Sequence, residues 1–185
     1  MKNQQLLEKM HTLQELYGEE IEEILSHYPD KRSALLPLLW LAQEHDGWIS
    51  ETRVVEIAQI LGLDPTEVRG VGGFYHLFYF HPVGKHTVRV CDDIVCALKG
   101  ADRLLDHLCD RLDVDVGETT ADGEFTVERT GWCVAACDHA PAVLIDDVYF
   151  GPVDEAQLDE MIARLRAGWQ PQVDEGIEVG VVGDS

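Results

Sequence analysis

Four cysteines form two pairs along this 185-residue chain: four residues separate Cys91 from Cys96, and three separate Cys133 from Cys137. Thiolates are soft ligands, and four of them gathered at one point form a metal-ligand set. Residues 97–132, between the pairs, are enough for a helix and strands that bring the pairs together. The spacing therefore predicts a redox or structural metal centre.

The spacing leaves two kinds of metal centre open. An iron–sulfur cluster accepts four thiolates at varied spacings, and a structural zinc site tolerates two to four residues between paired ligands. Disulfide chemistry is disfavoured, because the expected compartment is reducing and the C-x-x-C spacing of thioredoxin-like redox pairs is absent. The pattern favours an iron–sulfur cluster over zinc by a modest margin.

The fifth cysteine, Cys109, is not expected to be a ligand. It falls inside a predicted helix beside Leu105, Leu108 and Leu112. Free cysteines in such positions behave as small apolar core residues. We therefore leave Cys109 out of the candidate site.

The charge of the chain excludes a nucleic-acid partner. Fourteen basic residues against thirty-five acidic ones give a net charge of -21, which repels a phosphate backbone. Residues 1–90 carry 8 basic and 13 acidic side chains, whereas residues 91–185 carry 6 and 22. This acidic excess around the cysteines either solubilises the surface or meets a more basic partner subunit.

No targeting or membrane-spanning segment is predicted. The first twenty residues lack an apolar block and are acidic, unlike a signal or transit peptide. No apolar run approaches the roughly 20 residues of a membrane span. We therefore expect a cytoplasmic protein.

The elements that must position the cysteines are predicted in two parts, the first of them helical. Apolar residues recur at helical spacing up to about residue 80, and capping residues mark the breaks between helices. Ser33 is the expected cap of a helix over 34–45, and Gly70, Gly72 and Gly73 are expected to form a tight interhelical turn. The other expected caps are Ser50 for a helix over 51–61, Asp64 followed by Pro65, and Gly47 as a stop signal.

The second part alternates strands and helices. The β-branched run 87–90 ends directly at Cys91, a helix over 98–112 follows, and 125–128 forms a strand that leads to the second cysteine pair. A hairpin with its turn at Asp146 and Asp147 precedes a last helix that ends near Ala167. The order is β-α-β-β-β-α, so the predicted fold class is α+β, with a helical bundle followed by this mixed domain.

Several motifs together resemble one family. The runs 90–101, 117–123 and 133–141 look like the small thioredoxin-like 2Fe-2S subunit, the 24-kDa or E subunit, of NADH:quinone oxidoreductase, respiratory complex I. The segments 33–39, 47–49 and 71–75 resemble the helical domain of the same family. The likeness covers about residues 15–168.

The resemblance implies a helical bundle domain over 1–82, a thioredoxin-like 2Fe-2S domain over 83–168 and a flexible acidic tail over 169–185. It implies one 2Fe-2S cluster, with FMN and NADH held by a partner subunit, among other subunits of the peripheral arm at the cytoplasmic face of the inner membrane. The chain would then be part of an oxidoreductase, without catalysis of its own. The ligands carried over are Cys91, Cys96, Cys133 and Cys137.

Two other assignments stay open beside this one. Small subunits of NAD-linked hydrogenases and formate dehydrogenases share the same domain. A zinc-stabilised interaction module without a redox role is the alternative of a different class.

The second cysteine loop departs from the family pattern. Cys-Leu-Gly-x-Cys is usual there, whereas this chain has Val134 and Ala135. If the loop needs a positive φ at the glycine position, Ala135 strains it by about 1 kcal/mol. Pro141 is expected to follow a cis peptide bond, as in thioredoxin-like folds.

Overall fold

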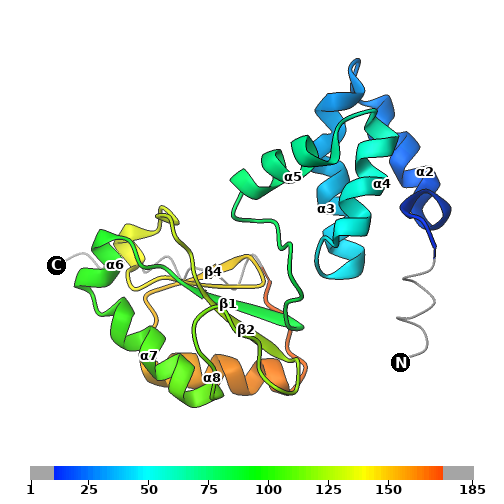
Figure 1. Ribbon diagram of the computed structural model, residues 1–185. Helices are drawn as coiled ribbons and strands as arrows, with labels where there is room; N and C mark the ends of the chain where they lie inside the picture. The colour runs from blue at the N-terminus through cyan, green and yellow to red at the C-terminus, as the bar shows by residue number, and fades with distance from the viewer. Residues whose placement is uncertain (1–10, 173–185) are drawn as a thin grey trace. The chain divides into compact units, whose positions relative to one another are not determined.

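The computed structural model describes residues 11–172, and the chain divides after Pro82 into two compact units (Figure 1). The first unit is helical, and the second combines a four-stranded sheet with helices. This confirms the α+β class and the predicted order of elements. No helix within residues 11–172 is long and apolar enough to cross a membrane.

Within residues 11–82, the first unit contains four α-helices, and most of the predicted caps are confirmed. Ser50 and Asp64 accept hydrogen bonds from the first turns of their helices, and Gly47 ends its helix at φ 79°. The Ser33 prediction is wrong, because residues 31–34 form a 3-10 turn capped by Asp30. The helices are α2 (Leu13–Ser26), α3 (Leu35–Asp46), α4 (Glu51–Leu61) and α5 (Pro65–Phe74).

The predicted turn at Gly70, Gly72 and Gly73 is also wrong, since all three residues lie inside α5. Gly72 is buried where α5 packs against the following segment. A Cβ there would lie 2.6 Å from the Phe80 ring and 3.0 Å from the Leu39 side chain. The glycine thus permits close packing and does not serve a turn.

We predict that Gly72→Ala lowers the free energy of unfolding by about 1–3 kcal/mol, because the added methyl group overpacks a closed contact. Gly70→Ala is the matched control in the same helix, where nothing lies within 4 Å of the added Cβ. In this control variant, the free energy of unfolding should rise by about 0.5–1 kcal/mol, because alanine has a higher helix propensity than glycine. Urea denaturation measures both, and equal effects would contradict the packing explanation.

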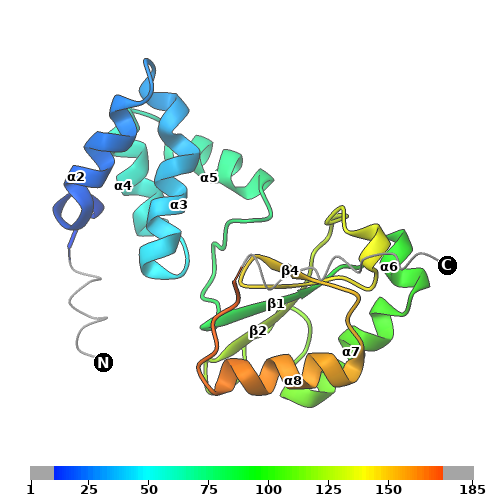
Figure 2. The ribbon, with the colours of Figure 1, turned by 180° about the vertical axis from the view of Figure 1, so that it is seen from behind.

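The second unit is built on a sheet of order β2-β1-β3-β4. Its strands are β1 (His86–Val90), β2 (Phe125–Arg129), β3 (Val143–Ile145) and β4 (Val148–Phe150). β1 pairs in parallel with β2 and antiparallel with β3. Helices α7 (Ala101–Leu112) and α8 (Glu155–Arg166) lie on the same side of the sheet in both views (Figures 1 and 2).

The helix predicted from Leu98 to Leu112 begins only at Ala101, and a separate short helix that was not predicted precedes it. A short α6 (Ile94–Leu98) ends at Lys99, and α7 begins after Gly100, which adopts φ 97°. Leu98 is 84 % exposed, whereas Leu105, Leu108 and Leu112 of α7 are buried. The left-handed glycine redirects the chain, so α6 and α7 do not share one apolar stripe.

The hairpin is confirmed, with Asp146 and Asp147 at φ 49° and 67° between β3 and β4. The Trp169 ring packs against Phe150, with centroids 5.8 Å apart, and under the Arg164 guanidinium. The packed chain therefore continues past residue 168, where the tail was predicted to start. Residues 173–185 of that tail lie outside the described residues.

Candidate metal centre

The strand order brings all four cysteines to one edge of the sheet. Cys91 directly follows β1, and Cys133 follows the parallel strand β2, so both lie at carboxyl strand ends. Cys137 precedes β3, whose antiparallel pairing puts its start at the same edge. The loop after β2 lies beside α6 in both views (Figures 1 and 2).

The first pair is buried. Cys91 is 1 % exposed and Cys96, in α6, is 2 % exposed. Asp93 caps α6 by accepting a hydrogen bond from the Ile94 amide, which fixes the turn between the two thiols. Burial raises the pKa of Cys96 to about 11, and the adjacent Cys91 thiol adds to the rise.

The second pair is exposed. The Sγ atoms of Cys133 and Cys137 lie 3.5 Å apart at the loop surface. The hydrogen bond with Cys133 is the main cause that raises the pKa of Cys137, followed by burial and by repulsion from Cys133, Cys91 and Asp93. Repulsion among the thiolates disfavours their joint ionisation, and a bound cation offsets that repulsion.

The backbone of the second loop agrees with two sequence predictions. Ala135 adopts φ 61°, the left-handed region that favours glycine. The peptide bond from Ala140 to Pro141 is cis, as expected. His139 is partly buried, and its Nδ1 atom lies 3.1 Å from the Asp138 carboxylate.

Side chains tie the two cysteine loops together. The Asp92 carboxylate accepts a hydrogen bond from the Gly131 amide at 3.1 Å. The Cys91 thiol faces the Trp132 carbonyl at 3.9 Å, and the Thr130 hydroxyl donates to that carbonyl at 2.6 Å. This role of Asp92 in positioning the second loop was not predicted from the sequence.

A buried arginine beside these loops was missed as well. Arg89, in the central strand, is 1 % exposed and donates to the Asp147 carboxylate at 2.8 Å. Its guanidinium carbon lies 5.9 Å from the centroid of the Trp132 ring. The sequence feature that could have indicated this burial is a charged residue inside the β-branched run 87–90. The structure shows that every residue of this strand is buried.

The donor set is two pairs of thiols, one pair on each loop, and the Sγ atoms of Cys133 and Cys137 lie 3.5 Å apart. A 2Fe-2S cluster has two irons, and four cysteines hold it. Cys109 is partly buried against the sheet core and stays outside the site.

Comparison with known proteins gives one consistent family. A family model described as thioredoxin-like [2Fe-2S] ferredoxin matches residues 21–166. The NADH-quinone oxidoreductase E 2 subunit of Rhizobium meliloti is 41 % identical over 149 residues, which cover 80 % of this chain and 88 % of that protein. NADH-quinone oxidoreductase subunit 2 of Thermus thermophilus is 40 % identical over 151 residues, covering 80 % and 83 %.

A solved structure is similar in fold to most of this chain. The crystal structure of an air-oxidised NAD+-reducing [NiFe]-hydrogenase superposes with a TM-score of 0.61 and 26 % sequence identity. The match covers 72 % of this chain but only 23 % of the hydrogenase chain. The shared part is therefore one region of a much longer protein.

We predict that Ala135→Gly raises the free energy of unfolding by about 1 kcal/mol, because glycine adopts the observed φ without a Cβ clash. Ala136→Gly is the control, since Ala136 has φ -107° and a buried methyl group. That control should lower the stability. Thermal denaturation at matched metal content measures both, and a destabilised Ala135→Gly would contradict the strain at this position.

Proposed function

The chain belongs to the thioredoxin-like [2Fe-2S] ferredoxin family, and on that premise we propose that it is an electron-transfer subunit of an NADH:quinone oxidoreductase. The family places one 2Fe-2S cluster on this chain. We propose Cys91, Cys96, Cys133 and Cys137 as its ligands. The observation that supports them is the placement of both pairs at one edge of the sheet.

The bound cluster supplies one-electron transfer. The role of the chain is to hold the thiolates on two loops, which the hydrogen bond from the Gly131 amide to the Asp92 carboxylate links to each other. Cys91 and Cys96 are buried, whereas Cys133 and Cys137 reach the surface. We infer that electrons enter and leave on the exposed side.

Apolar side chains beside the site support contact with another subunit. Ile94 and Leu98, on α6, are 73 % and 84 % exposed. Exposed apolar residues next to a functional site are typical of docking surfaces. We propose that this surface meets the subunit that holds FMN and NADH, because this chain has no dinucleotide-binding fingerprint. The complex would hold the chain at the cytoplasmic face of the inner membrane.

A second assignment has its own supporting observation, which is the match to an NAD+-reducing hydrogenase over 72 % of this chain. An equivalent role in a hydrogenase or formate dehydrogenase would use the same cluster and the same loops. Identification of the subunits that co-purify with the chain separates these complexes. The curated relatives favour the NADH:quinone oxidoreductase.

We predict that Cys137→Ser abolishes or strongly depletes the cluster, whereas Cys109→Ser leaves it intact. The parent protein should contain about two irons and two acid-labile sulfides per chain. Metal and sulfide analysis with visible absorption measures this. One zinc and no sulfide in the parent would support the zinc module, and cluster loss in Cys109→Ser would overturn the ligand assignment.

We also predict that Asp92→Asn with Asp93→Asn raises the midpoint potential. The added electron increases negative charge, which nearby carboxylates oppose. Asparagine keeps an acceptor oxygen for the Gly131 and Ile94 amides, so the loops should stay in place. Glu19→Gln with Glu22→Gln, on α2, is the control for the same change in net charge. A redox titration that gives the same potential for all three proteins would contradict the electrostatic effect.

A further inference from the structure

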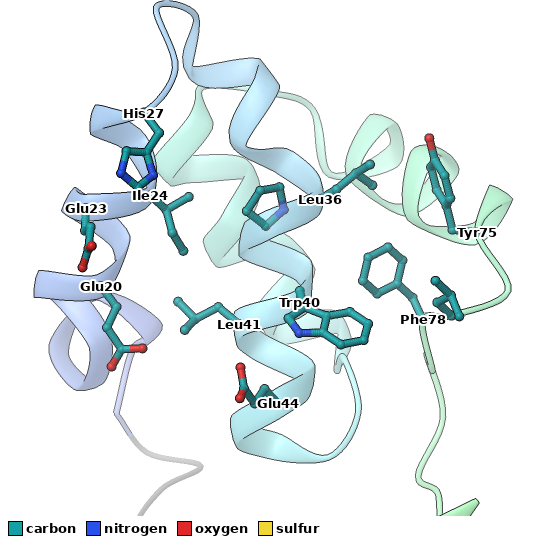
Figure 3. Close-up of a pocket in the computed structure, with 12 residues that line it drawn as sticks. Glu20, Glu23, Ile24, His27, Leu36, Trp40, Leu41, Glu44, Tyr75 and Phe78 are labelled. Carbon is teal, nitrogen blue, oxygen red and sulfur yellow. The ribbon is translucent and has the colours of Figure 1, made fainter. Parts of the chain in front are cut away.

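An apolar groove opens on the helical unit between α2, α3 and the turn that follows α5 (Figure 3). Its volume is about 680 Å³, within the range of pockets that enclose a ligand or several side chains. The electron-transfer role proposed above does not use this groove. Its apolar lining includes Ile24, Leu36, Trp40, Leu41, Tyr75 and Phe78.

The groove is held open by the fold. Gln43, which is 9 % exposed, donates from its amide to the Leu77 carbonyl at 2.8 Å and accepts from the Tyr79 amide at 2.7 Å. The rings of Trp40 and Phe78 meet edge to face, with centroids 6.3 Å apart. One wall is thus fixed to α3 before any ligand binds, which lowers the entropy cost of binding.

Large apolar side chains stay exposed along this groove. Trp40 is 44 % exposed, Leu77 40 % and Tyr75 39 %. Exposed aromatic residues that line a concave surface are the usual anchors of protein–protein interfaces. An α-helix with apolar residues at i, i+3, i+4 and i+7 fits such a groove.

The rim of the groove is acidic. Glu20 and Glu23 lie along its α2 side together with His27, and Glu44 lies at the end of α3 (Figure 3). Glu20 lies 3.5 Å from His45. Within the part of the chain that the structure describes, no Lys or Arg lies within 4.0 Å of the Glu23 or Glu44 carboxylate.

Three of the four basic side chains in residues 11–82 are engaged in ion pairs elsewhere. Residues 11–82 contain twelve acidic side chains against four basic ones. The three arginines all form ion pairs within the unit: Arg32 with Glu67, Arg53 with Asp46 and Glu56, and Arg69 with Glu51. The negative field at the groove is therefore available to an external cation.

We propose that this groove binds an amphipathic helix of another polypeptide, with its apolar face in the groove and Lys or Arg side chains against Glu20, Glu23 and Glu44. The charge selects this occupant. An anionic membrane surface would be repelled by the rim. A second copy of this chain, with net charge -21, would be repelled as well.

The test uses the full-length, cluster-loaded protein and a labelled model helix of about 18 residues, five turns, with Leu on one face and Lys on the other. A matched peptide carries Glu in place of Lys. Fluorescence anisotropy should show the Lys peptide binding at least about tenfold more tightly, with an affinity that falls as salt rises. Equal affinity for the two peptides would overturn the proposal.

Three variants locate the binding. Trp40→Ala and the double variant Glu23→Lys with Glu44→Lys should each weaken the Lys peptide at least about tenfold, and the double variant should bind the Glu peptide instead. Glu19→Lys with Glu22→Lys is the matched control, because both residues are exposed on α2 and neither lines the groove. Equal loss in the two double variants would mean a general charge effect and would overturn the site.

A photo-crosslinking residue at Trp40, in the complex isolated from its host, identifies the natural occupant. The expected adduct is a Lys- or Arg-bearing segment of another subunit with helical apolar spacing. An adduct to residues 1–10 of this chain would overturn the proposal in favour of self-occupancy. The cluster absorption of each variant is recorded in parallel, so that failure of the groove and failure of the electron-transfer role are distinguished.

Discussion

The parallel pairing of β1 with β2 is the constraint on which the metal centre depends. Parallel strands end at the same edge of a sheet, so the residues after Val90 and after Arg129 meet in space although they are distant in sequence. Pairing of β1 with β3 then returns the chain to that edge. Because β1 lies between both partners and is buried along its length, a shift in register would displace both cysteine loops at once.

The loops themselves need more than the sheet. A hydrogen bond from the Gly131 amide to the Asp92 carboxylate holds the second loop against the first, and one from the Thr130 hydroxyl to the Trp132 carbonyl orders the second loop internally. In the same loop, Ala135 adopts a left-handed conformation that costs an L-residue about 1–2 kcal/mol. A strained residue persists where the surrounding structure fixes its backbone conformation, and such residues concentrate at functional sites.

The two units present different surfaces. The edge of the sheet that carries the cysteines combines exposed thiols with exposed apolar side chains of α6. These groups can contact a redox partner. The helical unit presents a preformed apolar groove with an acidic rim. A partner helix bound in this groove would hold the subunit in a complex, so the loops that carry the cluster would not have to provide that contact area.

The sequence by itself determined the features that rest on local chemistry. Most helix boundaries follow from caps such as Ser50 and Asp64, and the hairpin follows from two aspartates that tolerate positive φ. The family resemblance, carried by short motifs, identified the fold and the cluster type, and the four ligands remain a prediction.

Only the tertiary structure decided the features that depend on distant neighbours. Gly72 looked like a turn residue because its contact with Phe80 is invisible until α5 is packed. The burial of Arg89 was not predicted, because the Asp147 carboxylate that it binds lies 58 residues further along the chain. Asp92 and the groove around Trp40 were missed for the same reason: close approach of segments far apart in the chain creates them, and local pattern carries no information on that approach.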